Sequence, residues 1–331
     1  MLSNHTSDPI ERQLREEALY KPYQSLNAYL KKKYGEKIYK IALDGGFTCP
    51  NRDGTCGTRG CIFCSAGGSG EFATAIRQNS SIDAQITQAL ARFGDKQTGQ
   101  RFIAYFQAYT GTYAAPERLY ALYHMALSHP KIVGISIATR PDCLPVPVLD
   151  VIKRCQMEFP DKFVWIELGL QSVHEKTALY IRRGYPLSCF EEALTALQTM
   201  SVPVIVHVIL GLPEETQADM LATIDYLSHK NIFGIKLQLL HVLRGTDLAA
   251  EYERDVFSCL SKEAYIDLLC SCIDHLNPAI VLHRVTGDGP KDLLIAPIWS
   301  LQKRDVLNSL HKALRDGEHF QGKDFGNHRP L

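Results

Sequence analysis

The chain has 331 residues, of which 45% are apolar and 22% are charged, a composition typical of a globular protein. Its 36 basic and 36 acidic residues cancel, which argues against broad, unspecific binding of nucleic acid, although a local basic patch can still form. No apolar run approaches the roughly 18 residues that cross a membrane, and the first residues are too polar for a secretory signal. We therefore expect a cytoplasmic protein without a membrane partner.

The predicted elements begin with a charged helical extension over residues 1–36, whose end is marked by three lysines and a glycine. From residue 37 to residue 286, short apolar segments alternate with amphipathic segments of helical length. Residues 287–331 then hold one helix, near 302–315, and a loose tail. Strands are expected at 37–44, 101–109, 133–139, 162–170, 202–212, 233–242 and 279–285, with helical patterns at 82–93, 116–128, 145–158, 173–182, 188–200 and 214–229.

This alternation of strands and helices predicts βαβ units and a parallel sheet, and so an α/β fold. The first six strands make too few units for a full eight-unit barrel, and they fit either an open doubly wound sheet or a partial barrel. In both architectures the chemistry lies at the C-terminal ends of the strands. The polar residues expected there are Asp44, Gln107, Thr110, Thr139, Arg140, Glu167, Gln171, His207 and Gln238.

Four of the ten cysteines lie in one polar loop after the first predicted strand, in the segment CPNRDGTCGTRGCIFC. A disulfide knot, a zinc site and an iron–sulfur cluster are the alternatives, and a reducing compartment disfavours the first. Four thiolates would suit tetrahedral zinc, whereas three thiolates around a cubane would leave one iron open to another ligand. The spacing alone does not decide between zinc and iron.

Several segments together resemble the radical S-adenosylmethionine (SAM) superfamily, in the branch of the Elongator catalytic subunit and coproporphyrinogen-dehydrogenase-like enzymes, and in particular the bacterial YhcC/YtqA-type family. They include DGGFTCPNRDGT, RGCIFC, AYFQAYTGTYAAP, ELGLQSVHEKTA and VHVILGLPEET. The resemblance implies a partial (β/α)6 TIM-like barrel with N- and C-terminal extensions, an oxygen-labile 4Fe–4S cluster, SAM, and an electron donor such as flavodoxin or ferredoxin. It makes Cys49, Cys61 and Cys64 the cluster ligands and excludes Cys56, because the family pattern has no cysteine there.

The resemblance also implies which residues bind SAM. Gln171 is expected at the ribose. Arg183 is expected at the carboxylate, since a guanidinium fork matches a carboxylate, although a solvated helix end would also explain this arginine. Gly211 belongs to the segment expected to contact adenine, a segment that could also be a simple helix start. The full set of predicted SAM-binding residues is Gln107, Thr110, Thr139, Arg140, Glu167, Gln171, Arg183 and Gly211.

A reaction is implied as well, namely radical modification of a tRNA wobble uridine by loss of the carboxymethyl group from its aminomethyl substituent. No residue is assigned to catalysis. Two alternatives stay open: a radical SAM enzyme for a small metabolite or protein, and a non-catalytic, zinc-stabilised module that binds nucleic acid.

The substrate side of the sequence is less informative. Either Arg244 or Arg284 could hold a substrate carboxylate or an RNA phosphate. Other polar residues near the last strands are His241, His283 and Asp288. Since the net charge is zero, RNA would need a local basic patch, for which the candidates are Lys31, Lys32, Lys33, Lys37, Lys40, Arg244 and Arg284.

Overall fold

The computed structural model describes residues 22–68, 70, 81–93, 99–287 and 289–326. Residues 1–21 of the predicted helical extension, the last residues of the predicted tail and Asp288 lie outside this part. The division into residues 1–36, 37–286 and 287–331 stays a prediction. Among the described residues, no helix is both long enough and apolar enough to cross a membrane.

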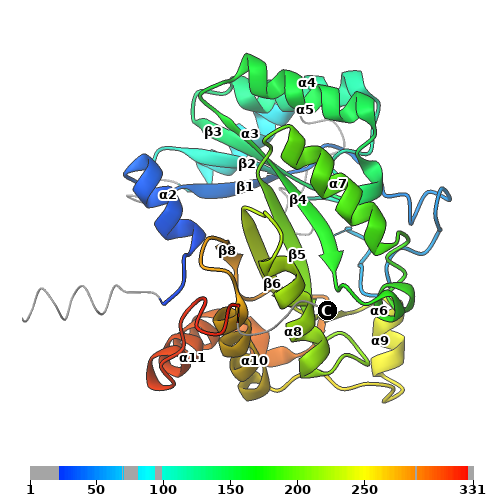
Figure 1. Ribbon diagram of the computed structural model, residues 1–331. Coiled ribbons are helices and arrows are strands. Elements are labelled where there is room, and N and C mark those ends of the chain that lie inside the picture. Colours follow the sequence, from blue (N-terminus) through cyan, green and yellow to red (C-terminus); the bar gives the residue numbers. More distant parts are fainter. Residues whose placement is uncertain (1–21, 69, 71–80, 94–98, 288, 327–331) are drawn as a thin grey trace, which may run out of the picture.

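Seven parallel strands form one curled sheet in the order β1-β2-β3-β4-β5-β6-β8 (Figure 1). The predicted α/β fold with a partial barrel is therefore confirmed, and the strand expected at 279–285 adds a seventh strand to the six predicted units. The strands are β1 (Tyr39–Leu43), β2 (Phe102–Phe106), β3 (Ile132–Thr139), β4 (Phe163–Gln171), β5 (Val204–Leu210), β6 (Gly234–Leu239) and β8 (Val281–Arg284).

Helices pack on the outer face of this sheet, and the main apolar core lies between the two layers (Figure 1). Every residue of β2 and β3 is buried, as expected for strands covered on both faces. The helices are α3 (Ile82–Ala91), α4 (Pro116–Ser128), α5 (Val146–Glu158), α6 (Glu175–Tyr180), α7 (Leu187–Thr199), α8 (Gln217–Ser228), α9 (Asp247–Tyr252), α10 (Lys262–His275) and α11 (Lys303–Asp316). Short elements complete the fold: an antiparallel pair, β7 (Val242–Leu243) with β9 (Leu294–Ala296), and the 3-10 helices η1 (Pro141–Cys143) and η2 (Ile298–Leu301).

A separate apolar cluster closes the N-terminal end of the barrel. Leu30 of α2 (Leu26–Tyr34) packs there against residues near the starts of the strands, namely Ile38, Ile103, Val133, Trp165 and Ile205. Because the site of an α/β barrel lies at the C-terminal ends of the strands, α2 lies at the end of the barrel away from that site.

The two ends of the described chain meet beside β8. The backbone N–H of Leu282 donates to the carbonyl of Gln24 at 2.8 Å, and the N–H of Gln321 donates to the carbonyl of Pro22 at 2.8 Å. The N–H of Gln24 in turn donates to Oε1 of Gln321 at 2.8 Å. The outer edge of β8 is therefore covered by the start of the described chain.

Candidate functional site

A cavity lies at the C-terminal ends of the strands, where the sequence predicts the site. Three cysteines of the loop after β1 line it, and we name Cys49, Cys61 and Cys64 the cavity cysteines. Gly211 is not among the lining residues, although Ile209 of the same segment is. The other predicted SAM-binding residues all line the cavity, namely Gln107, Thr110, Thr139, Arg140, Glu167, Gln171 and Arg183.

Cys56 lies apart from the cavity cysteines. Its side chain is exposed, and it lines a different pocket, which includes Arg59 and Leu179. A zinc site built from all four cysteines would require Cys56 to turn into the main cavity, whereas three thiols already line that cavity. This division of the cysteines fits a cubane cluster that leaves one iron open.

The cysteine loop is fixed by buried hydrogen bonds to a distant part of the chain. The side-chain amide of Asn51 donates to the carbonyls of Arg182 at 2.8 Å and Arg183 at 3.2 Å. Gly184 follows directly, with a φ of 84°, and a Cβ atom at this position would lie 2.6 Å from Oδ1 of Asn51. The loop therefore approaches the segment between α6 and α7 so closely that only glycine fits there.

Two arginines place positive charge beside the thiols. Arg52 and Arg140 both line the cavity, and both interact electrostatically with Cys49. Arg52 also donates to the carbonyl of Cys64 at 2.9 Å. A 4Fe–4S cluster held by three thiolates carries net negative charge, which neighbouring guanidinium groups stabilise. These residues therefore fit such a cluster.

Gln171 carries an unsatisfied polar atom in the cavity wall. Its Oε1 is buried and has no hydrogen-bond partner, and its backbone φ of 65° lies in the left-handed region. A buried acceptor without a donor is costly, and a ligand with a hydroxyl or amino group would satisfy it. Strained backbone at a cavity wall is also a common property of ligand-binding residues.

Arg183 holds the backbone around Gln171 in place. Only 1% of this residue is exposed. Its guanidinium group donates to the carbonyls of Leu170 at 3.1 Å, Ser172 at 2.7 Å and Tyr185 at 3.0 Å. The alternative of a solvated arginine at a helix end is therefore wrong, and most of its donors already have partners within the chain.

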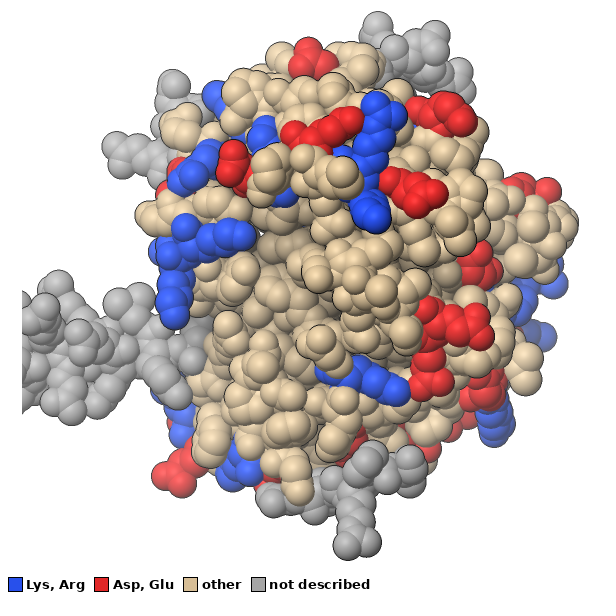
Figure 2. Space-filling view, turned by 45° about the horizontal axis from the view of Figure 1, so that its top comes forward, with Lys and Arg blue, Asp and Glu red and all other residues tan. Residues whose placement is uncertain are grey.

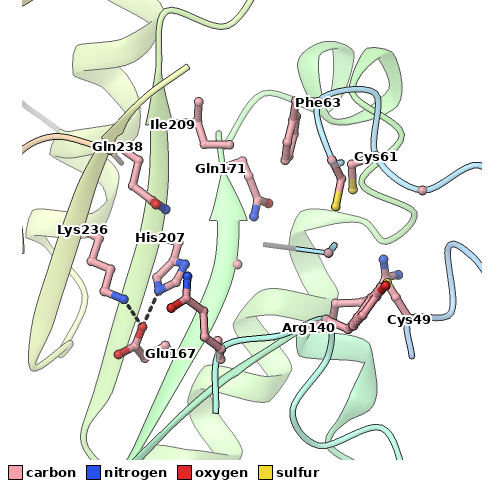
Figure 3. Close-up of a pocket in the computed structure, with 18 of the residues that line it drawn as sticks. Cys49, Cys61, Phe63, Arg140, Glu167, Gln171, His207, Ile209, Lys236 and Gln238 are labelled. Carbon is pink, nitrogen blue, oxygen red and sulfur yellow. Dashed lines mark hydrogen bonds and ion pairs between the residues drawn. The ribbon is translucent and has the colours of Figure 1, made fainter. Parts of the chain in front are cut away.

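A largely buried polar cluster lies at the floor of the cavity, which Tyr105, Glu167, His207 and Lys236 line. We name it the floor cluster: Lys40, Tyr105, Ser136, Glu167, His207 and Lys236. The carboxylate of Glu167 accepts from Lys40 at 2.5 Å, from Ser136 at 2.5 Å, from His207 Nε2 at 2.6 Å and from Lys236. Lys236 also donates to the hydroxyl of Tyr105 at 3.0 Å. In Figure 3, Glu167, His207 and Lys236 lie on one side of the cavity, and Cys49, Cys61 and Phe63 lie on the other.

Burial and charge together set the protonation of this cluster. Burial alone would raise the pKa of Glu167, but the positive charges of Lys236 and Lys40 hold it well below its usual range. Burial lowers the pKa of the Lys236 ammonium group to about 7, and the pKa of His207 to about 4. Glu167 is therefore ionised and His207 is neutral at physiological pH, and Lys236 can change its charge there.

Comparison with known proteins identifies the family to which the chain belongs. The model of the Radical SAM superfamily matches residues 54–227, and the model of the Radical_SAM C-terminal domain matches residues 232–316. The chain belongs to the Radical SAM superfamily. Members of this superfamily bind a 4Fe–4S cluster and SAM, which are the cofactors predicted from the sequence.

Relatives confirm the predicted branch of the superfamily. Over 305 residues the chain is 41% identical to the uncharacterized protein YtqA of Bacillus subtilis, covering 92% of this chain and 93% of that one. Over 287 residues it is 37% identical to protein YhcC of Escherichia coli K12, with 87% and 90% covered. The solved structure of an N-terminally deleted Elp3 from the archaeon Methanocaldococcus infernus has the same fold, with a TM-score of 0.62 at 14% identity over 85% of this chain and 63% of that one.

The predicted roles of individual residues in this radical SAM protein stay predictions. Glu167 is among the predicted SAM-binding residues, yet four side chains of the chain itself occupy its carboxylate. Thr139 has its hydroxyl 2.5 Å from that of Thr112, and Arg140 is paired with Asp142 at 2.6 Å. The unsatisfied Gln171 is the predicted residue with the clearest need for a ligand.

Of the lysines predicted to form an RNA-binding patch, one is used inside the barrel, and three others lie far from the cavity. Lys40 points into the floor cluster, where it pairs with Glu167 at 2.5 Å. Lys31, Lys32 and Lys33 lie in the last turn of α2, at the opposite end of the barrel.

Sequence reasoning missed Lys236 and Tyr105 of the floor cluster. One signal was available for Lys236, because it is the single charge in the apolar strand GIKLQL. A lysine inside a buried strand must have a polar partner. Nothing in the sequence distinguished Tyr105 from the apolar residues around it.

Proposed function

We propose that this radical SAM protein removes the carboxymethyl group from the aminomethyl substituent of the wobble uridine in tRNA. The observation that carries the proposal is one cavity that is lined by three cysteines and, across from Cys49 and Cys61, by the ionisable groups of Glu167, His207 and Lys236. The family resemblance of the motifs described above implies this reaction. The cytoplasm is the proposed location, since tRNA is modified there.

The cavity cysteines are the proposed ligands of the 4Fe–4S cluster, and Gln171 is a proposed contact of SAM. When bound, these cofactors supply a 5′-deoxyadenosyl radical that abstracts a hydrogen atom from the substrate. The chain itself positions the substrate and excludes water. Phe63 contributes to this exclusion, because it lines the cavity between two of the cysteines in sequence. A flavodoxin or a ferredoxin is the proposed electron donor.

The proposed site of hydrogen abstraction is the methylene carbon between the nitrogen and the carboxylate of the substituent. Both neighbouring groups stabilise a radical at this carbon. Loss of one further electron to the electron-carrier protein and of the N–H proton would give an imine, and addition of water would break its C–N bond, releasing glyoxylate and leaving the aminomethyl group. The proposal therefore requires a cavity that accepts a carboxylate, and the presence of Lys236 in the lining is compatible with this requirement.

The scattered positive charges on the surface are compatible with a small number of contacts to RNA phosphates. In Figure 2, lysines and arginines are scattered over the visible face, and a broad region without charged side chains lies between them. We therefore expect tRNA to be held by a few phosphate contacts and by the modified base in the cavity. Binding should weaken as the salt concentration rises. The plot of log affinity against log salt concentration should have a shallow slope, because each neutralised phosphate contributes about 0.7–0.9 to it and only a few phosphates are contacted.

The test is the nucleoside content of tRNA from a strain that lacks this protein. It should accumulate 5-carboxymethylaminomethyl uridines and lose their 5-aminomethyl products. Purified protein with reductant and SAM should restore the products in that tRNA. Cys61→Ala should fail to restore them, whereas Cys155→Ala, which changes a buried cysteine of α5 outside the cavity, should succeed. An unchanged profile, in a strain without a parallel pathway, would exclude tRNA and favour a small metabolite or protein as the substrate.

A further inference from the structure

The amino group of Lys236 has two fixed partners and one open position. Its Nζ donates to the carboxylate of Glu167 and, at 3.0 Å, to the hydroxyl of Tyr105. A third hydrogen-bond partner of this nitrogen is absent from the described residues. Lys236 lines the cavity, and 5% of its side chain is exposed. The remaining position on its nitrogen is therefore open to a bound ligand.

The two partners determine what the open position of Lys236 offers to that ligand. The ionised carboxylate of Glu167 can only accept hydrogen bonds. Burial raises the pKa of Tyr105 well above 10, so its hydroxyl keeps its proton, which it shares with Glu167, and its oxygen accepts from Lys236. When Lys236 is neutral, its two N–H groups therefore serve these partners, and its lone pair occupies the open position. This lone pair lies across the cavity from Cys61 and Phe63 (Figure 3).

The neighbouring groups of the floor cluster are less suited to accept a proton. Although burial alone would raise the pKa of Glu167, the lysines hold it well below its usual range, and four side chains already donate to its carboxylate. His207 donates its Nε2–H to Glu167, and burial lowers its pKa to about 4. Burial lowers the pKa of Lys236 only to about 7. A base works best when its pKa lies near the working pH, which favours Lys236.

We propose that Lys236 is the base that accepts the proton leaving the nitrogen of the substrate. The identity of the substrate rests on the proposed function. The carbon radical gives one electron to the electron-carrier protein, and the nitrogen lone pair forms the C=N bond. The N–H bond then breaks, its electron pair stays on the nitrogen, and the proton binds the lone pair of Nζ, so that the amine of Lys236 becomes an ammonium group. Glu167 and Tyr105 are positioning residues, because they act through Lys236.

The surroundings of Lys236 provide a signature that a structural role would not produce. Glu167 raises the pKa of Lys236, and Lys40 lowers it. Lys40→Met should therefore raise this pKa, and Glu167→Gln should lower it. The ionisable groups that act on Lys236 come from five strands, namely Lys40 of β1, Tyr105 of β2, Glu167 of β4, His207 of β5, and His283 and Arg284 of β8.

The first experiment does not depend on tRNA. Lysine labelled with carbon-13 at Cε reports its own titration by NMR in reconstituted, oxidised protein, and the signal missing from Lys236→Met identifies Lys236. Its midpoint should lie near pH 7, rise in Lys40→Met and fall in Glu167→Gln. This result in a protein that leaves tRNA unchanged would support Lys236 as a base for another substrate and refute the proposed function. A midpoint near the ordinary lysine value of about 10.4 would overturn the proposal even if tRNA is processed.

The second experiment measures kcat against pH for tRNA that carries 5-carboxymethylaminomethyl uridine, with iron content and SAM affinity measured for every variant. In the wild type kcat should rise through about pH 7, because Lys236 accepts a proton only when it is neutral. Lys236→Met should lower kcat by about 10²- to 10⁴-fold and keep the iron content and SAM affinity of the wild type. Lys236→Arg should be equally slow, because a guanidinium group keeps its proton. Lys40→Met should keep kcat at high pH but shift the rise to higher pH.

Two further variants serve as controls for this assignment. Lys230 pairs with Glu191 at 2.9 Å outside the cavity, so Lys230→Met should leave the pH profile unchanged. His241 also lines the cavity, with Nε2 at 3.2 Å from Oγ of Ser300, and is the rival base. His241→Gln should keep the rise near pH 7. A kcat near the wild-type value in Lys236→Met or Lys236→Arg, or a rise lost only in His241→Gln, would overturn the proposal.

Discussion

Replacing Glu167 by glutamine tests whether the negative charge of this residue stabilises the floor cluster. The change preserves shape, but it removes the negative charge that pairs with Lys40 and Lys236. Removing one partner of a buried ion pair typically costs about 3–5 kcal/mol. We expect a loss near the lower end of this range, about 3 kcal/mol of unfolding free energy, because each of the two lysines can adapt to the loss of its partner. Lys40 keeps 20% of its side chain exposed to water, and the lowered pKa of Lys236 allows it to lose its proton.

The assay is urea-induced unfolding of the protein without cofactors, followed by circular dichroism under reducing conditions at pH 6. Glu158→Gln is the matched control, since Glu158 pairs with Arg154 at 2.8 Å on the surface and its loss should barely move the midpoint. Adding Lys236→Met to Glu167→Gln should recover part of the lost stability, because the unpaired cation is removed. A loss below about 1 kcal/mol for Glu167→Gln would show that the charge of Glu167 does not hold this cluster together.

Four further predictions concern the cofactors and the pH dependence of stability. Replacing any one of the cavity cysteines by alanine should abolish iron and sulfide binding in anaerobically reconstituted protein, whereas Cys56→Ala should retain both; stoichiometric zinc without sulfide would refute the cluster. Gln171→Ala should weaken SAM binding by about five- to tenfold without loss of iron, as measured by calorimetry, because one hydrogen bond is worth about 1 kcal/mol. Arg183→Ala should weaken SAM binding more than Gln171→Ala, since it also frees the backbone that holds Gln171; normal SAM affinity in this variant would contradict its assignment. Finally, the folded pKa of Lys236 of about 7 lies below its unfolded value, so the unfolded chain binds more protons above pH 7. Stability should therefore rise from pH 7 toward pH 10, and Lys236→Met should lose this rise.

The fold could be predicted from local pattern, because apolar strands alternate with amphipathic helices through most of the chain. The floor cluster could not be predicted in this way, because it depends on the curl of the sheet. Lys40 on β1 and Lys236 on β6 lie five strands apart in the sheet order. In a flat sheet that separation would be roughly 24 Å. Curling brings both ammonium groups onto Glu167 of β4, and no local pattern encodes the degree of curl.

The candidate site, like the fold, could be predicted from the sequence only in part. The spacing of the cysteines showed that a metal centre was possible but left zinc open, and the family resemblance selected three ligands. The structure adds that Cys56 lines a different pocket. The anchoring of the loop by Asn51 and Gly184 depends on contacts between residues 131 or more positions apart, and these contacts are invisible to local pattern. Arg183 was predicted as a ligand residue, yet its backbone partners could be seen only in three dimensions.

The junction of the two chain ends beside β8 has a consequence for biosynthesis. Gln24 and Gln321 are 297 positions apart, and their hydrogen bond is one of several that cover the outer edge of β8. During translation, the segment around Gln24 leaves the ribosome long before its partners exist. The barrel can therefore be completed only after residue 321 has been synthesised, since contacts at such separation form late. Until then the apolar rows of the early strands remain accessible to chaperones, and shortening the chain near residue 321 should impair folding even though the cavity itself is intact.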